Sequence, residues 1–238
     1  MENQTINNPV KGKNFRLLAD VIGVPKRHIN CGFRNFEVTE ENKKYFEICK
    51  TWVGENSITL TGKTGLGKTH LALAMLRNFP MKEYNNETLE IFEARKIKNI
   101  LDTSAEDSEE YKKAKIAYEN ELYKFRRASC MFVPMVELFI RLNEEAMDKG
   151  KLTTLNKYSD ETYDCICFDD LGAEKLTDAK RENLYYIIDS RYRNMLPTIV
   201  TSNFTINEIN DVEPRIASRL SEMGDIIQLN GKDYRLRK

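Results

Sequence analysis

Short apolar runs alternate with longer amphipathic segments along most of the chain. The runs are rich in β-branched residues or bounded by turn residues, and they predict strands at residues 57–61, 130–133, 163–168, 198–201 and 225–229. Apolar residues at helical spacing predict helices that begin near residue 70 and that span 40–53 (with Thr39 as N-cap), 135–147, 178–194 and 213–221. Strands that alternate with helices predict an α/β fold, a parallel five-stranded sheet flanked by helices.

Two segments depart from this alternation. Residues 1–13 have a disordered character, residues 14–22 predict a short amphipathic helix, and this end of the chain is locally basic. Its charge favours contact with DNA or an acidic partner and equally a solvated arm. Residues 81–128 are highly charged, lack Gly and Pro, and predict an inserted helical hairpin, which is either a packed structural insertion or a partner-binding arm. We therefore divide the chain into a basic N-terminal arm, 1–38, and a core domain, 39–238, with a helical insertion, 81–128.

Composition indicates a soluble protein and says little about partners. Among 238 residues, Lys+Arg and Asp+Glu both number 37, so any basic surface must be local. Apolar runs stay shorter than the roughly 18 residues of a membrane helix, and the polar first residues do not resemble a signal peptide. The five cysteines form no C-x-x-C pair, which predicts reduced thiols in a cytoplasmic protein and disfavours a zinc site.

The most informative motif is the loop between the first predicted strand and the helix near residue 70. Its sequence fits G-x-x-x-x-G-K-[ST], the phosphate-binding loop of nucleotide triphosphatases. Glycines let the backbone wrap closely around a triphosphate, and N–H groups at the start of the helix point at it. The residues expected to bind the nucleotide, ATP, are Gly62, Lys63, Thr64, Gly65, Leu66, Gly67, Lys68, Thr69 and His70.

A second group of polar residues follows two later strands. Asp169 and Asp170 come directly after the strand at 163–168, and Asn203 follows the strand at 198–201. Asp169 and the Thr69 hydroxyl are expected to hold Mg²⁺, and Asp170 to orient or deprotonate the attacking water. Asn203 is expected to hydrogen-bond the γ-phosphate or the water. Carboxyl ends of parallel strands meet at one edge, so these residues and the loop predict a single site.

The chain at this point resembles the DnaC/IstB-like branch of the AAA+ ATPases. The resemblance covers residues 25–80 and 129–238 and rests on five blocks in serial order, which are Gly62–Ala72, Phe168–Glu174, Arg191–Asn203, Arg215–Leu220 and Tyr234–Arg235. It implies that Lys68 and Thr69 belong to Walker A, Asp169 and Asp170 to Walker B, and Asn203 to sensor 1. It further implies that Arg219 is an arginine finger acting on a neighbouring subunit and that Arg235 is sensor 2.

The implied function is that of an ATPase in DNA replication that self-associates through the ATP site. Members of this family bind single-stranded DNA and load a replicative hexameric helicase, or they assist a transposase. The chain departs from the pattern in its short N-terminal segment and in the 81–128 insertion. At Asp170 most AAA+ proteins carry Glu, but this branch often has Asp. The helicase contact could therefore lie in the first 35 residues or in the insertion.

Our hypothesis from the sequence is a cytoplasmic helicase loader that hydrolyses ATP with Mg²⁺. Three alternatives stay open at this point. An IstB-like ATPase that assists a DNA transposase would bind duplex DNA. A nucleotide-dependent binding switch would turn over little ATP. A small-molecule P-loop kinase is disfavoured by the double acid at 169–170 and by the late arginines, among which Arg215 and Arg219 are not distinguished.

Overall fold

The computed structural model describes residues 19–79, 82–83, 108–109, 111–113, 125–126, 128–147, 153–172, 177–231 and 233–234. Three predictions lie largely or wholly outside these ranges. They are the disordered start at 1–13, the helical hairpin within 81–128, and the role of Arg235. At the two ends of that insertion, β3 (Lys82–Glu83) and β4 (Phe125–Arg126) form a small antiparallel ribbon.

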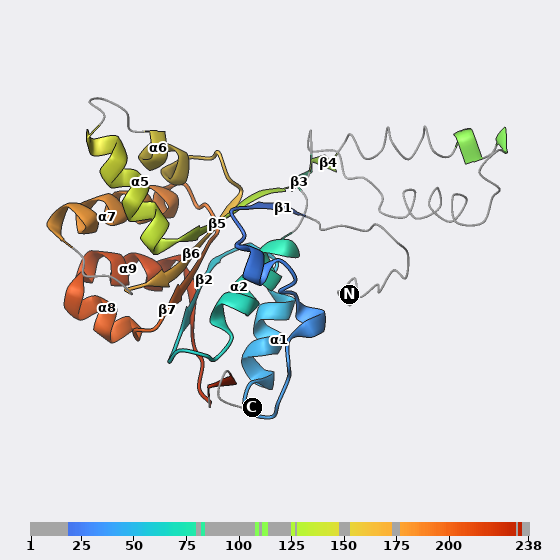
Figure 1. Cartoon of the computed structure of the whole chain (residues 1–238), viewed down its shortest axis with the longest axis horizontal. Helices are drawn as coiled ribbons and strands as arrows, with labels where there is room; N and C mark the ends of the chain where they lie inside the picture. Colours follow the sequence, from blue (N-terminus) through green and yellow to red (C-terminus); the bar gives the residue numbers. More distant parts are fainter. Residues whose placement is uncertain are drawn as a thin grey trace.

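A parallel sheet of six strands forms the centre of the molecule (Figure 1). Its order is β1 (Ala19–Ile22), β5 (Ala128–Pro134), β6 (Cys165–Leu171), β7 (Thr198–Ser202), β2 (Ser57–Thr61) and β8 (Gly224–Gln228). All five predicted strands are present, and the α/β architecture is confirmed.

The sixth strand, β1, corrects the sequence prediction. The predicted helix at 14–22 is wrong over its last four residues, which pair in parallel with β5 in the register Val21↔Cys130. A segment this short carries too little periodicity to separate helix from strand. The segment forms a strand because the edge of β5 is available, and pairing with this edge satisfies the backbone polar groups of the segment.

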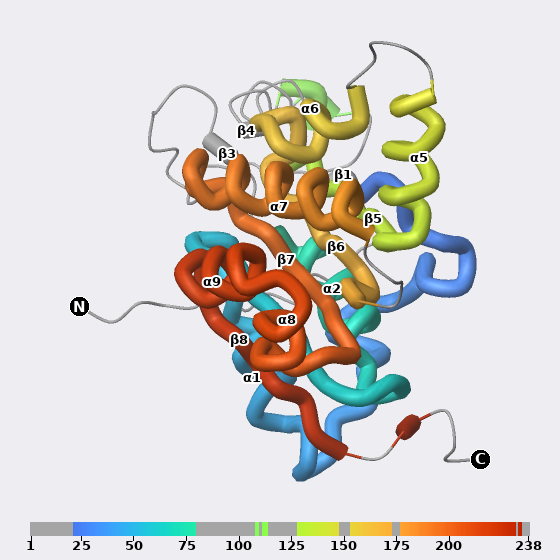
Figure 2. The backbone as a smooth tube through the Cα atoms, turned by 90° about the vertical axis from the view of Figure 1, so that its left-hand side faces the viewer, coloured from blue at the N-terminus to red at the C-terminus, as the bar shows by residue number. Residues whose placement is uncertain are grey.

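Helices cover both faces of the sheet. On one face lie α1 (Lys43–Thr51) and α2 (Lys68–Arg77). On the other lie α5 (Met135–Met147), α6 (Thr153–Ser159), α7 (Asp178–Arg193), α8 (Ile206–Val212) and α9 (Pro214–Met223), and Figure 2 looks onto α7, α8 and α9. Side chains alternate along β5, so that Cys130 and Phe132 enter the core under α2 while Met131 and Val133 enter the core under α5.

The helix ends show which local signals were sufficient. Thr177 caps α7 as predicted, since its side chain accepts a hydrogen bond from the Lys180 N–H. The predicted cap at Thr39 is wrong, because α1 begins at Lys43 and the Thr39 N–H donates to the Asn42 side chain. The short helices α6 and α8 were not predicted, and each is only seven residues long. Within the described ranges, no helix is both long and apolar enough to span a membrane.

Candidate nucleotide-binding site

The loop from Gly62 to Gly67 joins the carboxyl end of β2 to the first residue of α2. Gly62 and Gly67 both adopt positive φ angles, 135° and 86°, which L side chains rarely adopt. A Cβ on Gly62 would lie 2.4 Å from the Leu229 carbonyl oxygen, and one on Gly67 would lie 2.7 Å from the Phe36 ring. Glycine is therefore required here by conformation and by space, and the loop leaves its backbone open to a ligand at the N-terminus of α2.

Lys68 is the cation of this loop and is almost completely buried. Its Nζ donates to the carbonyl oxygens of Gly62, at 2.6 Å, and Lys63, at 2.8 Å. The same Nζ donates to the Asn203 Oδ1 at 2.9 Å. The lysine thus connects the loop to the end of β7, and Lys68 and Asn203, predicted from separate motifs, are direct neighbours.

Asp169 is the second charged group of the site and is 7% exposed. Its Oδ1 accepts hydrogen bonds from the Thr69 hydroxyl, at 2.9 Å, and from the Thr201 hydroxyl, at 2.7 Å. Burial raises the pKa of Asp169 to about 6, and this outweighs the opposite effect of the two hydroxyls and of Lys68. Thr69 and Asp169, both expected to hold Mg²⁺, are therefore direct neighbours.

Asp170 lies next to Asp169 but differs from it in exposure and backbone conformation. The strand was predicted to end at Phe168, whereas β6 continues through both acids to Leu171. Asp170 has a φ of 62° and an exposed side chain, and its N–H donates to the Thr201 hydroxyl at 2.9 Å. One acid therefore points into the protein and the other reaches solvent at the same edge of the sheet.

These residues fit a nucleotide with its magnesium ion. The glycine positions leave no room for side chains, so the loop backbone packs closely against Leu229 and Phe36. The adjacent oxygens of Thr69 and Asp169 are ligands of the kind that Mg²⁺ prefers. Among the described residues, no group of three or more His, Cys, Asp or Glu side chains could hold a metal on its own. Two protein oxygens suit Mg²⁺, which usually completes its coordination with water and phosphate oxygens.

Segments from both ends of the described chain contact the loop and the first turn of α2. His70, expected to bind nucleotide, places its Nε2 2.9 Å from the Gly32 carbonyl oxygen, and its ring contacts Phe36 edge-on. At the other end, the Tyr234 N–H donates to the Gly65 carbonyl oxygen at 3.0 Å. The contacts of Gly32 and Phe36 with this region were not predicted, because single residues so distant in the sequence leave no local signal.

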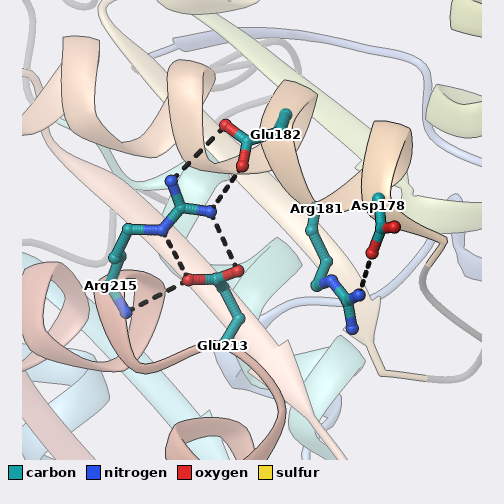
Figure 3. A network of polar contacts seen from close by, with 5 residues as sticks. All are labelled: Asp178, Arg181, Glu182, Glu213 and Arg215. Carbon is teal, nitrogen blue, oxygen red and sulfur yellow. Dashed lines mark hydrogen bonds and ion pairs between the residues drawn. The ribbon is translucent and has the colours of Figure 1, made fainter.

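The predicted arginines lie apart from the loop, on the face formed by α7 and α9. Arg219 donates from its Nε to Asp189 at 2.7 Å, and its guanidinium lies 4.6 Å from the centre of the Tyr192 ring. Arg215 is held by Glu213 and Glu182, as Figure 3 shows, so both of its terminal nitrogens are engaged by carboxylates. The structure thus brings together Lys68 and Thr69 with the polar ends of β6 and β7, while Arg219 stays outside this group and Arg235 lies outside the described residues.

Asp169→Asn is expected to stabilise the protein in the absence of metal. The folded-state pKa of Asp169, about 6, exceeds the ordinary value of about 4. Its contribution to the free energy of unfolding is therefore fully present at low pH, where the carboxyl is protonated, and is lost as the pH rises through 6. A neutral amide removes this loss, and we expect unfolding at pH 8 to cost about 1–2 kcal/mol more, with no gain at pH 4. Urea unfolding in EDTA at both pH values measures the free energy of unfolding of wild type and variant. Asp211→Asn, at an exposed position of α8, serves as the control. An Asn variant less stable than wild type at pH 8 would contradict the assigned burial cost.

Comparison with known proteins adds a family and a fold. The family model described as IstB-like ATP binding protein matches residues 116–238, a range that contains the acid pair, Asn203 and the late arginines. The chain is similar to the uncharacterized protein YqaM and to the phage-like element PBSX protein XkdC, both of Bacillus subtilis (strain 168). The identities are 26% over 213 residues and 25% over 209 residues, covering 82% and 84% of this chain. It spans only 51% and 60% of the length of these two relatives.

A solved structure shares the fold. The DnaC helicase loader superposes with a TM-score of 0.58 at 21% identity, covering 87% of this chain and all of that one. An identity this low speaks for the fold alone. The superposition confirms the AAA+ type of P-loop fold expected from the five sequence blocks.

Proposed function

The chain belongs to the family of IstB-like ATP-binding proteins, and we propose that it is an ATPase that acts in DNA replication as a helicase loader binding single-stranded DNA. The observation that carries the ATPase proposal is that two hydrogen-bonded pairs, Lys68 with Asn203 and Thr69 with Asp169, lie at the carboxyl edge of the sheet. The loader proposal is supported by the shared fold with a helicase loader over its whole length.

In the proposed reaction, Lys68 exchanges its loop carbonyl partners for the β- and γ-phosphate oxygens of ATP. Thr69 and Asp169 hold Mg²⁺, which offsets the phosphate charge when bound. Asp170, exposed beside them, orients and deprotonates the attacking water. Asn203, whose Oδ1 accepts a hydrogen bond from Lys68, donates to the γ-phosphate through its amide nitrogen.

The site needs a cation from a second subunit, and Arg219 is the better candidate than Arg215. A finger must present its terminal nitrogens to the phosphates of the next subunit. Those of Arg215 are engaged by Glu182 and Glu213, at 2.8 Å and 3.1 Å in the closer contacts. Asp189 holds Arg219 through its Nε and so fixes the direction of the side chain. The Arg219 Nη1 lies 3.6 Å from the Glu222 carboxylate, which is longer than the contacts of Arg215. We therefore assign self-association to the α7–α9 face, with Arg219 completing the neighbour's site.

The experiment that tests the function is ATP hydrolysis by the purified protein alone, with single-stranded DNA and with duplex DNA, with Lys68→Ala as the blank. We expect hydrolysis that single strands stimulate by about tenfold and duplex does not, an order-of-magnitude estimate from the 1–3 kcal/mol usual for coupling between sites. Release of phosphate and nucleotide affinity are measured on the same samples, so that binding and turnover are separated.

Each other outcome contradicts a defined part of the proposal. Stimulation by duplex alone would indicate an ATPase that assists a DNA transposase. Tight binding of ATP without turnover in any condition would indicate a nucleotide-dependent switch, and Asp170 would lose its catalytic role. Hydrolysis by the Lys68→Ala variant at the wild-type rate would disprove the site itself.

A further inference from the structure

The two acids at the end of β6 lie on a β-bulge. The pairing of β6 with β7 runs Phe168↔Val200 and then Leu171↔Ser202, with a shift in register between the two pairs. Two residues of β6, Asp169 and Asp170, therefore stand opposite one residue of β7. An extra residue in one strand bends it and redirects its side chains. This accounts for adjacent acids that differ so much in burial.

The residue opposite the bulge is Thr201, and its hydroxyl contacts both acids. The Thr201 Oγ1 donates to the Asp169 Oδ1 at 2.7 Å and accepts from the Asp170 N–H at 2.9 Å. Thr201 is fully buried. A hydroxyl is both donor and acceptor, so one oxygen can fix a carboxylate and a backbone N–H at the same time.

The bulge needs such a partner for two reasons. A β-bulge takes the extra residue out of the ladder of backbone hydrogen bonds, and an unpaired N–H in a partly buried place destabilises the folded state. Asp170 also has a φ of 62°, a strained conformation for a non-glycine residue that persists only where the surrounding structure enforces it. The bond from the Asp170 N–H to Thr201 offsets the first cost and opposes relaxation of the second.

We propose that Thr201 is a positioning residue of the ATPase site, whose hydroxyl holds Asp169 against Thr69 and keeps Asp170 in its left-handed conformation. The inference rests on the proposed ATPase function and deepens it. Thr201 does not touch the nucleotide in this role. It acts through the carboxylate that holds Mg²⁺ with Thr69 and through the backbone of the residue that orients the water.

The chain offers a matched pair of substitutions for the test. Thr201→Val keeps the shape of the side chain and removes the hydroxyl, while Thr201→Ser keeps the hydroxyl. Thr198→Val makes the same change at the other end of β7, where a fully buried hydroxyl accepts from the Arg191 Nε at 2.9 Å and donates to the Leu196 carbonyl oxygen at 3.0 Å. The control therefore loses a buried hydroxyl of the same strand without touching either acid.

The first measurement is the equilibrium affinity for a fluorescent ADP analogue in EDTA and in Mg²⁺, which does not depend on turnover. We expect wild type and all three variants to bind alike in EDTA. Mg²⁺ should tighten binding of the ADP analogue by a similar factor in wild type, Thr201→Ser and Thr198→Val. In Thr201→Val this factor should be about ten times smaller, as expected when a partner of a metal ligand is removed. The second measurement is ATP hydrolysis at saturating ATP and Mg²⁺, where kcat should fall about tenfold or more in Thr201→Val and stay near wild type in Thr201→Ser and Thr198→Val.

The outcomes separate this inference from the proposed function. Thermal unfolding of each variant shows whether it is folded. If Thr201→Val does not fold, Thr201→Ser is used instead, and a smaller increase in affinity with Mg²⁺ than in wild type would overturn the role of the hydroxyl. A wild-type gain that Thr201→Val retains in full would overturn the role of Thr201 alone. A loss of equal size in Thr198→Val would mean that the effect is general to β7 and would also overturn it. A wild type without any gain from Mg²⁺ would overturn the metal assignment together with the inference.

Discussion

Asp170→Asn is expected to reduce ATP hydrolysis about a thousandfold while ATP still binds, within the range usual for loss of a catalytic acid–base group. The exposed side chain of Asp170 takes no part in the hydrogen bonds that join Lys68 to Asn203 and Thr69 to Asp169. An amide of the same size leaves those contacts in place and removes the negative charge that attracts a proton from water. Loss of turnover without loss of affinity is the signature of a group that acts in the transition state.

The measurement combines single-turnover hydrolysis with nucleotide affinity in Mg²⁺. Asp211→Asn serves as the control, because it makes the same chemical change at an exposed position on α8. A thousandfold slower single turnover at unchanged affinity supports the assignment. Hydrolysis within a fewfold of wild type would show that another group orients the water and that Asp170 only flanks the metal ligand.

Arg219→Ala is expected to lower hydrolysis about a thousandfold, as removal of an arginine finger does in other phosphoryl-transfer enzymes. The effect should appear only where subunits associate, because Arg219 lies on the α7–α9 face and away from the contacts of Lys68 and Asp169 in its own chain. Affinity for nucleotide should change little, since the loop is intact.

Mixing two inactive variants tests the trans arrangement directly. Lys68→Ala retains Arg219 but has a defective loop, while Arg219→Ala retains the loop and lacks the finger. In a head-to-tail assembly, random mixing in equal amounts places an intact loop beside an intact finger at about a quarter of the interfaces. We therefore expect about a quarter of wild-type hydrolysis from the mixture, and a mixture as inactive as its components would contradict completion of the site by a neighbour.

Two neighbouring arginines provide the controls. Arg193 binds the same Asp189 at 3.0 Å from a more exposed position on α7, so Arg193→Ala removes a partner of that carboxylate and leaves Arg219 in place. Arg215→Ala removes the arginine that Glu182 and Glu213 hold. Both variants should keep most of their activity. If Arg215→Ala were inactive and rescued by mixing while Arg219→Ala were active, the finger would be Arg215.

Much of the site followed from the sequence because its motifs are local. The residues from Gly62 to Thr69 join β2 to α2, and their roles depend on backbone conformations that glycine permits over a few residues. Alternation of strands and helices was enough to place the ends of β6 and β7 at the same edge as this loop. Lys68 and Asn203 therefore meet as expected, although 135 residues separate them.

Other features depended on contacts that no local pattern reports. The predicted helix over Ala19–Ile22 became a strand because the edge of β5 was free to pair with it. In the sequence, Thr201 is not distinguishable from any other β-branched strand residue. Only the bulge in β6 places the Asp169 carboxylate and the Asp170 N–H against its hydroxyl. Phe36 and Tyr234 reach the loop from opposite ends of the described chain.

The sequence by itself determined the phosphate-binding loop, the presence of five parallel strands and the edge at which the acids lie, since each of these follows from residue types over short spans. Tertiary structure alone decided that Asp169 is buried with a raised pKa, that Asp170 is exposed, and that Asp189 orients Arg219. Burial and side-chain hydrogen bonds arise between segments that are distant in the chain, so their effect on a charged group exists only once the sheet and its helices have packed.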